Sequence, residues 1–192
     1  MRLNDSREQS CYTVLMKRKD KTPIVYAFID SQNLNLGIRS QGWVLDFKKF
    51  RLYLKNKYHV EKAYLFIGMV PGNEQLYTHL SEMGYSLVFK PTVKYKVDDK
   101  YTYKGNVDAE LVLYASARCF KEYDKAIIVS GDGDFSCLAR YLEGKGKLGG
   151  LMCPNKRYSS LLREYRNRIN IIGGARNQLE YKMTRSGGRS KP

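Results

Sequence analysis

Short apolar runs alternate with segments of helical period along most of this chain. The apolar runs have the length and composition of buried strands, and they occupy residues 24–29, 62–67, 86–89, 126–130, 148–152 and 169–172. Between them the apolar residues follow a helical period, which predicts helices over 47–57, 73–83, 107–120, 135–143 and 159–166. Such alternation is typical of an α/β fold, in which helices cover a mostly parallel sheet.

Three segments depart from this alternation, so we expect a single domain over residues 23–173 with additions to it. Residues 1–22 are polar and charged, which favours an N-terminal arm. Residues 92–104 alternate in the manner of strands around an Asp-Asp pair, which predicts a hairpin inserted into the domain. Residues 174–192 are rich in Gly, Ser and Arg, which predicts a basic, disordered tail.

The charge balance points to a polyanionic partner. The chain has 34 Lys and Arg residues against 19 Asp and Glu residues, a net charge of +15. Nucleic acid is the leading candidate, with RNA expected and DNA left open. No apolar run is long enough to cross a membrane, which predicts a cytoplasmic protein without membrane contact. The sequence does not decide between a monomer and a homodimer.

Four aspartates stand at positions where such a fold would bring them together. Asp30 ends the first apolar run, and Asp132 and Asp134 directly follow the run 126–130. Because the carboxyl ends of parallel strands meet at one edge of the sheet, ligands of open α/β sheets bind there. Asp108 opens the longest predicted helix, on the face that should pack against the sheet. We therefore expect these four side chains to gather at that edge.

Each aspartate taken alone has an ordinary structural explanation. Aspartate at a strand end is a frequent turn residue, and in the first turn of a helix it is stabilised by about 0.3 to 1 kcal/mol. Four carboxylates together would repel one another unless a cation compensated them. Hard divalent cations prefer oxygen ligands, so the group predicts a site for Mg²⁺ or Mn²⁺. Without the cation, at least one aspartate should have a raised pKa.

Three motifs, in this order along the chain, resemble those of a known family. They are Phe28-Ile29-Asp30-Ser31-Gln32-Asn33-Leu34, Lys104-Gly105-Asn106-Val107-Asp108 and Val129-Ser130-Gly131-Asp132-Gly133-Asp134-Phe135. They are similar to the motifs of the NYN domain, a branch of the PIN-like nucleases, and especially of its LabA-like members. The resemblance covers residues 24–172.

The resemblance implies a three-layer PIN-like fold, with a mostly parallel central sheet of strand order 3-2-1-4-5 flanked by helices. It also implies that Asp30, Asp108, Asp132 and Asp134 bind Mg²⁺ or Mn²⁺ and carry the catalysis, with Asn33 as an auxiliary substrate-binding residue. Two departures bear on the substrate surface and leave the metal ligands in place. Gly133 stands where family members often have Ser, and residues 162–166 lack an expected acidic feature.

The hairpin and its end supply candidates for contact with the substrate. Lys94 and Lys96 alternate with Tyr95, and Tyr103 and Lys104 follow on the return strand. Aromatic rings beside cations suit unstacked bases, and Lys104 is placed to contact a phosphate oxygen. Tyrosines packed across the hairpin with solvated lysines fit the same pattern equally well, so both readings stay open.

Together these features predict a metal-dependent nuclease, most simply an endoribonuclease that hydrolyses RNA phosphodiester bonds through the aspartate group. The main alternative is a noncatalytic RNA-binding or regulatory NYN-domain protein, although the intact set of four aspartates speaks against it. Another alternative is a phosphohydrolase acting on a small ester, and the net charge of +15 favours a polymer over such a substrate.

Overall fold

The central sheet has six strands, all paired in parallel. The computed structural model describes residues 22–91, 93–97, 100–104 and 108–182. The strands are β1 (Val25–Asp30), β2 (Val60–Met69), β3 (Tyr85–Pro91), β6 (Lys125–Val129), β7 (Leu148–Cys153) and β8 (Ile169–Ile171). Their order is β3-β2-β1-β6-β7-β8. The predicted α/β fold and the order 3-2-1-4-5 are confirmed, and β8 extends that order by one strand.

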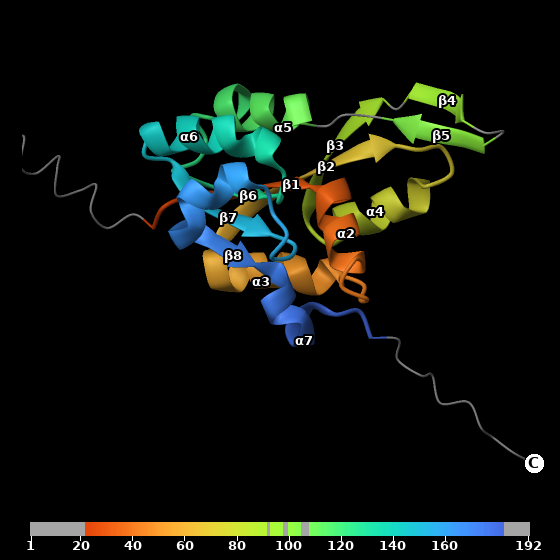
Figure 1. The fold of residues 1–192 in the computed structure, drawn as a ribbon, viewed down its shortest axis with the longest axis horizontal. Helices are drawn as coiled ribbons and strands as arrows, with labels where there is room; N and C mark the ends of the chain where they lie inside the picture. Colours follow the sequence, from red (N-terminus) through yellow and green to blue (C-terminus); the bar gives the residue numbers. More distant parts are fainter. Residues whose placement is uncertain (1–21, 92, 98–99, 105–107, 183–192) are drawn as a thin grey trace, which may run out of the picture.

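Helices cover both faces of the sheet, which makes three layers (Figure 1). One face carries α2 (Ser31–Arg39), α3 (Phe47–Tyr58), α4 (Glu74–Glu82) and α7 (Arg176–Leu179). The other carries α5 (Asp108–Leu113), the π-helical turn η1 (Tyr114–Arg118), α6 (Ser136–Gly144) and the 3-10 helix η3 (Ser160–Arg168). The 3-10 segments η2 (Gly133–Phe135) and η4 (Ile172–Ala175) complete the elements.

Strand β1 shows how the sequence specifies these layers. All six of its residues are buried. Ala27 and Ile29 face the core that contains α2 and α3, whereas Tyr26 and Phe28 face the core that contains α5 and α6. Because successive side chains of a strand point to opposite faces, a continuous apolar run fits only a strand that is covered on both sides.

The helix α2 was not predicted, because its segment begins with polar residues of low helix propensity. The structure shows what compensates for this. Asp30 caps the helix by accepting hydrogen bonds from the backbone N–H groups of Gln32 and Asn33. Leu34 and Ile38, one turn apart, are then fully buried against the sheet. Capping and burial together favour a helix where propensity alone does not.

The described elements continue past the predicted tail boundary at residue 174. Residues 174–182 continue the ordered domain, and the predicted tail beyond them lies outside the described residues, as does most of the predicted N-terminal arm. Leu179, at the end of α7, is 1% exposed, and its carbonyl accepts a hydrogen bond of 2.8 Å from the Asp46 N–H. The Gly and Arg content of this segment predicted disorder, but one buried leucine holds the segment against α3.

The segment inserted between β3 and α5 contains two paired strands. Strand β4 (Val93–Val97) runs antiparallel to β5 (Lys100–Lys104), and the register sets Lys94 opposite Tyr103. The pair forms its own sheet and stands out from the body of the domain in Figure 1.

Within the described ranges, no helix is both long and apolar enough to cross a membrane.

Candidate functional site

The chain reverses its direction across the sheet between β1 and β6. From β1 it proceeds outward through β2 to β3, and it then returns to the other side of β1 to form β6, β7 and β8. At the carboxyl ends of β1 and β6, where Ile29 is paired with Val129, the two connections diverge. Crevices at such switch points are where open α/β sheets bind ligands. Asp30 and Asp132 both lie at this point, as expected.

Asp30 is a buried carboxylate that is held in one orientation. Asp30 is 5% exposed. Its Oδ1 accepts hydrogen bonds of 3.1 Å from the backbone N–H groups of Gln32 and Asn33, and its Oδ2 accepts one of 3.3 Å from the Ser130 hydroxyl. The orientation of the Asp30 carboxylate therefore depends on the capped start of α2 and on Ser130.

Burial raises the pKa of the Asp30 carboxyl above its ordinary value. The hydrogen bond from the Asn33 N–H opposes this increase, while the negative charge of Asp108 adds to it. A raised pKa was expected from crowding of the acids, but the structure gives loss of water contact as the larger cause. Ionised Asp30 is therefore a destabilised anion that would gain from a nearby cation.

Ser130 connects Asp30 to Asp132. The Ser130 hydroxyl oxygen accepts a hydrogen bond of 3.1 Å from the Asp132 N–H while its proton is donated to Asp30. Asp132 in turn caps η2, because its Oδ1 accepts the Asp134 N–H at 3.1 Å. Asp132 is half-buried, whereas Asp134 is exposed. The sequence placed Ser130 in a motif without giving it a role, and its position directly after a buried strand was the available signal.

Gly133 has a steric reason to be glycine. A Cβ atom at this position would overlap the Ser159 side chain. The serine that often occupies this position in the family would therefore require Ser159 and the start of η3 to move. The departure noted in the sequence thus reflects close packing of η2 against η3.

Asp108 comes from the opposite side of the site. It is the first residue of α5, a helix that packs against β1 and η2, and it is half-exposed. Its charge acts on the Asp30 carboxyl, so the two acids are electrostatically coupled. Asp134 does not join this pair. Within the part of the chain that the structure describes, no three acidic, His or Cys side chains lie close enough to form a metal-binding group.

Asn33 joins the ends of the two central strands. Its side-chain Oδ1 accepts a hydrogen bond of 2.9 Å from the Gly131 N–H, while its own N–H is donated to Asp30. The side-chain Nδ2 makes no hydrogen bond with the residues described. Asn33 was predicted as an auxiliary to substrate binding. In the structure its side-chain oxygen bonds to the Gly131 backbone, and its Nδ2 remains available as a donor.

The predicted substrate contacts on the hairpin can be placed only along the backbone. Lys94, Tyr95 and Lys96 lie on β4, and Tyr103 and Lys104 lie on β5. The side chains of these five residues fall outside what the structure describes. Their contact with a substrate remains a prediction.

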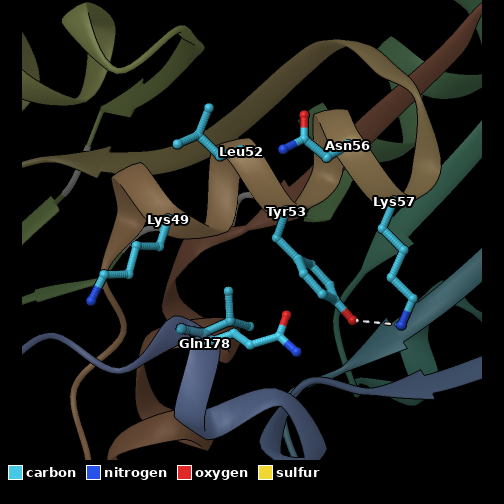
Figure 2. A pocket seen from close by; sticks show the side chains of 7 residues that line it. Lys49, Leu52, Tyr53, Asn56, Lys57 and Gln178 are labelled. Atoms are coloured by element: carbon cyan, nitrogen blue, oxygen red, sulfur yellow. Dashed lines mark hydrogen bonds between the residues drawn. The ribbon is translucent and has the colours of Figure 1, made fainter.

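The surface of the described residues has several hollows, and two of them differ in how their polar groups are bound. One, of about 190 Å³, lies beside the aspartates and is lined in part by Asn33 and Gly131. The other, of about 410 Å³, lies between α3 and α7 and is shown in Figure 2. In the second, Lys49 donates a hydrogen bond of 2.9 Å to the Glu180 carbonyl, and Lys57 donates one of 2.9 Å to the Tyr53 hydroxyl.

Comparison with known proteins settles the family. The family model of the NYN domain matches residues 25–172. The chain belongs to the NYN domain family. This NYN domain is similar to the low amplitude and bright protein LabA of Synechococcus elongatus, with 26% identity over 125 residues, 62% of this chain and 67% of LabA. The predicted resemblance is therefore confirmed at the level of the family.

A solved structure confirms the fold of this NYN domain independently. The crystal structure of a protein of unknown function from Vibrio parahaemolyticus is similar to it with a TM-score of 0.69 at 20% identity. The likeness covers 85% of this chain and 99% of the Vibrio protein. At that identity the comparison shows a shared fold and nothing about activity.

Proposed function

We propose that this NYN domain is a metal-dependent ribonuclease that hydrolyses phosphodiester bonds of RNA at the edge formed by Asp30, Asp108 and Asp132. The supporting observation is the state of Asp30. It is a buried carboxylate at the switch point of the sheet, electrostatically coupled to Asp108 and connected through Ser130 to Asp132. A residue that only caps a helix needs neither a second acid beside it nor burial of its own carboxylate.

The donors of this edge fit Mg²⁺ or Mn²⁺. Mg²⁺ typically takes one or two carboxylates and fills its other positions with water and substrate phosphate. Asp30 and Asp108 would provide such a pair, and Asp132 would add a third carboxylate to the same edge. A group of three side chains is therefore not required. Bound metal supplies a more acidic water and neutralises the charge that develops on the phosphate oxygens.

The residues of the chain then have separate tasks. The N–H groups of Gln32 and Asn33 fix Oδ1 of Asp30, so that Oδ2 keeps one direction. Ser130 fixes the start of the Asp132 turn relative to Asp30. Asp134, which is exposed, would add negative charge near the edge without binding the metal directly. Lys94, Lys96 and Lys104, with Tyr95 and Tyr103, hold the strand from the hairpin side.

A polymeric substrate follows from the charge of the whole chain. A net charge of +15 raises the local concentration of a polyanion, whereas a small phosphate ester gains little from charges far from the site. We assign RNA as the substrate because the chain belongs to a branch of the PIN-like nucleases. Cleavage of DNA is a separate outcome of the same assay.

The proposal is tested by incubating the full chain with end-labelled single-stranded RNA and DNA of the same sequence in Mg²⁺, Mn²⁺ or chelator. We expect RNA cleavage with metal, none with chelator, and loss of cleavage in Asp132→Asn. Asp124→Asn is the matched control, because Asp124 lies beside the opposite end of β6 and accepts the Ile24 N–H at 2.8 Å. Cleavage that persists in chelator would contradict the metal assignment.

A noncatalytic RNA-binding protein is the second candidate. One observation favours it, namely the net charge of +15, which attracts RNA without requiring a metal site. Such a protein would bind RNA with strong salt dependence and leave it intact in every metal. The same assay therefore separates the two functions.

A further inference from the structure

The smaller hollow is formed by three elements that meet beside the aspartates. Helix α2 contributes Asn33 and Leu36, the loop after β6 contributes Gly131, and the loop after β7 contributes Arg157 and Tyr158. Asn33 and Gly131 also belong to the site, since they are hydrogen-bonded to each other and Asn33 is bonded to Asp30. The hollow is thus continuous with the candidate active site.

Its walls are built by tight contacts between segments far apart in the sequence. A Cβ atom on Gly37 would lie 2.6 Å from the Cβ of Pro154, so only glycine allows α2 to approach this closely. The Asn155 side chain donates a hydrogen bond of 2.9 Å to the Gly37 carbonyl, and its Oδ1 accepts the Arg157 N–H at 2.8 Å. These contacts fix the backbone at Arg157 against α2.

The groups that face the hollow combine a cation, an amide donor and apolar surface. The Arg157 guanidinium is exposed and makes no hydrogen bond or ion pair within the described ranges. Leu36 is 57% exposed, although it is one of the larger apolar residues of α2. Tyr158 lines the hollow and packs behind it against the core of the α5 and α6 layer. Asn33 contributes its unused Nδ2.

We propose that this hollow is a subsite for one nucleotide of the RNA strand, next to the bond that is cut. Arg157 pairs with the phosphate, and Leu36 with Tyr158 contacts the base. The assignment rests on the nucleic-acid substrate proposed above. At about 190 Å³ the hollow is smaller than the roughly 300 to 1,000 Å³ of sites for drug-sized ligands, so it would take the base and leave the sugar and phosphate at its mouth, beside the exposed Arg157.

Positioning is the expected consequence for the reaction. An arginine that holds a neighbouring phosphate fixes the register of the strand, so that one phosphodiester bond lies over Asp30. Arg157 is accordingly a substrate-binding residue and takes no part in proton transfer.

The first test is equilibrium binding of a fluorescent single-stranded oligoribonucleotide to the full chain in chelator, where no cleavage occurs. We expect Arg157→Gln to weaken binding by about tenfold, which corresponds to 1.4 kcal/mol. Lys156→Gln is the matched control, because Lys156 is exposed, adjacent and carries the same charge but does not line the hollow. Arg157→Lys should restore only part of the loss.

The apolar part of the subsite has its own pair of variants. Leu36→Ala should weaken binding a few-fold, whereas Leu52→Ala should leave it unchanged, since Leu52 is 50% exposed but lines the hollow between α3 and α7. Adenosine 5′-monophosphate should shift the NMR amide signals of Gly37 and Gly131, and inorganic phosphate should do so less. Equal shifts from phosphate alone would remove the base from the assignment and overturn it.

Failure of the subsite and failure of the proposed function give different results. Metal-dependent cleavage together with equal affinities of Arg157→Gln and Lys156→Gln would overturn the subsite and retain the ribonuclease. Binding that depends on Arg157 without any cleavage would retain the subsite and overturn the ribonuclease. Thermal melting of each variant within a few degrees of wild type shows that a loss of affinity does not come from unfolding.

Discussion

The hollow between α3 and α7 and the hollow beside the aspartates differ in the state of their polar groups as well as in their size. The larger one, about 410 Å³ between α3 and α7, has two lysines that already bond to the protein itself. The smaller one, about 190 Å³, adjoins a buried carboxylate and has a guanidinium without a partner in the described structure. Its location at the switch point of the sheet adds to the difference.

Cavity volume alone is therefore a poor guide to a binding site. Groups that are satisfied within the fold stabilise it and have little left for a ligand. Groups that are fixed in place yet lack a compensating charge interact strongly with a ligand that supplies one.

The largest expected effect is the loss of RNA cleavage in Asp30→Ala and Asp108→Ala. Each change removes a proposed metal ligand, and even loss of a group that only supports a ligand typically costs roughly 10- to 100-fold. We therefore expect single-turnover cleavage rates to fall about a hundredfold or more. Asp124→Asn, at the other end of the sheet, should retain the wild-type rate. Wild-type rates in both alanine variants would end the assignment of these residues.

The next effect concerns the wall of the smaller hollow. Gly37→Ala should lower the free energy of unfolding by about 1 to 3 kcal/mol, because its Cβ would overlap Pro154. Gly144→Ala is the matched control, since no atom lies within 4 Å of its added Cβ and it ends α6. That control should be neutral or slightly stabilising. Chemical denaturation measures both, and equal stabilities would mean that α2 does not pack tightly on this loop.

A pH-dependent change in stability is expected for Asp30→Asn without metal. The folded-state pKa of Asp30 is raised from its ordinary 3.8, so below pH 3.8 its carboxyl is protonated in both states and adds no penalty. As pH rises through 3.8 toward the raised folded value, wild type loses stability, and above that value the loss stays constant. Asparagine carries no such charge and still caps α2.

Thermal melting across this pH range in chelator measures the difference. At neutral pH Asp30→Asn should melt above wild type, while at acidic pH the two should converge. Added Mn²⁺ at about a hundred times its dissociation constant should stabilise wild type by roughly 2.7 kcal/mol and the variant by much less. A variant that melts below wild type at neutral pH would show that the Asp30 carboxylate acts mainly as a hydrogen-bond acceptor.

The smallest effect is expected in the larger hollow. Lys57→Met removes an exposed hydrogen bond to Tyr53 and should change the free energy of unfolding by less than about 0.5 kcal/mol. RNA cleavage should stay at the wild-type rate. A marked loss of cleavage in Lys57→Met would mean that the hollow between α3 and α7 takes part in function after all.

Sequence predicted the parts of this protein that depend on local pattern. All six strands of the central sheet follow from short apolar runs, and the longest continuous run marks β1, which is covered on both faces. Asp30 ends the first apolar run and Asp132 follows the fourth. The strand order that the family resemblance implied sets these two strands side by side, so the two aspartates were expected to be neighbours. The coupling of Asp108 to Asp30 was likewise anticipated from the helix face on which it lies.

What sequence did not predict depends on contacts between distant segments. The helix α2 needs the cap from Asp30 and the burial of Leu34, neither of which shows in its propensities. Gly37 and Pro154 are in contact although more than half of the chain separates them in sequence. No local sequence pattern therefore predicts the hollow beside Arg157. The buried Leu179 is one apolar residue in a polar segment, which periodicity cannot detect.

The central claim is that Asp30 and Asp108 together hold a divalent metal ion. Binding of Mn²⁺ to the full chain, followed by the loss of the free-ion electron paramagnetic resonance signal, tests it most directly. We predict saturable binding to wild type and to Asp124→Asn, and strongly weakened binding to Asp30→Asn and Asp108→Asn. Binding of equal affinity to all four proteins would contradict the claim.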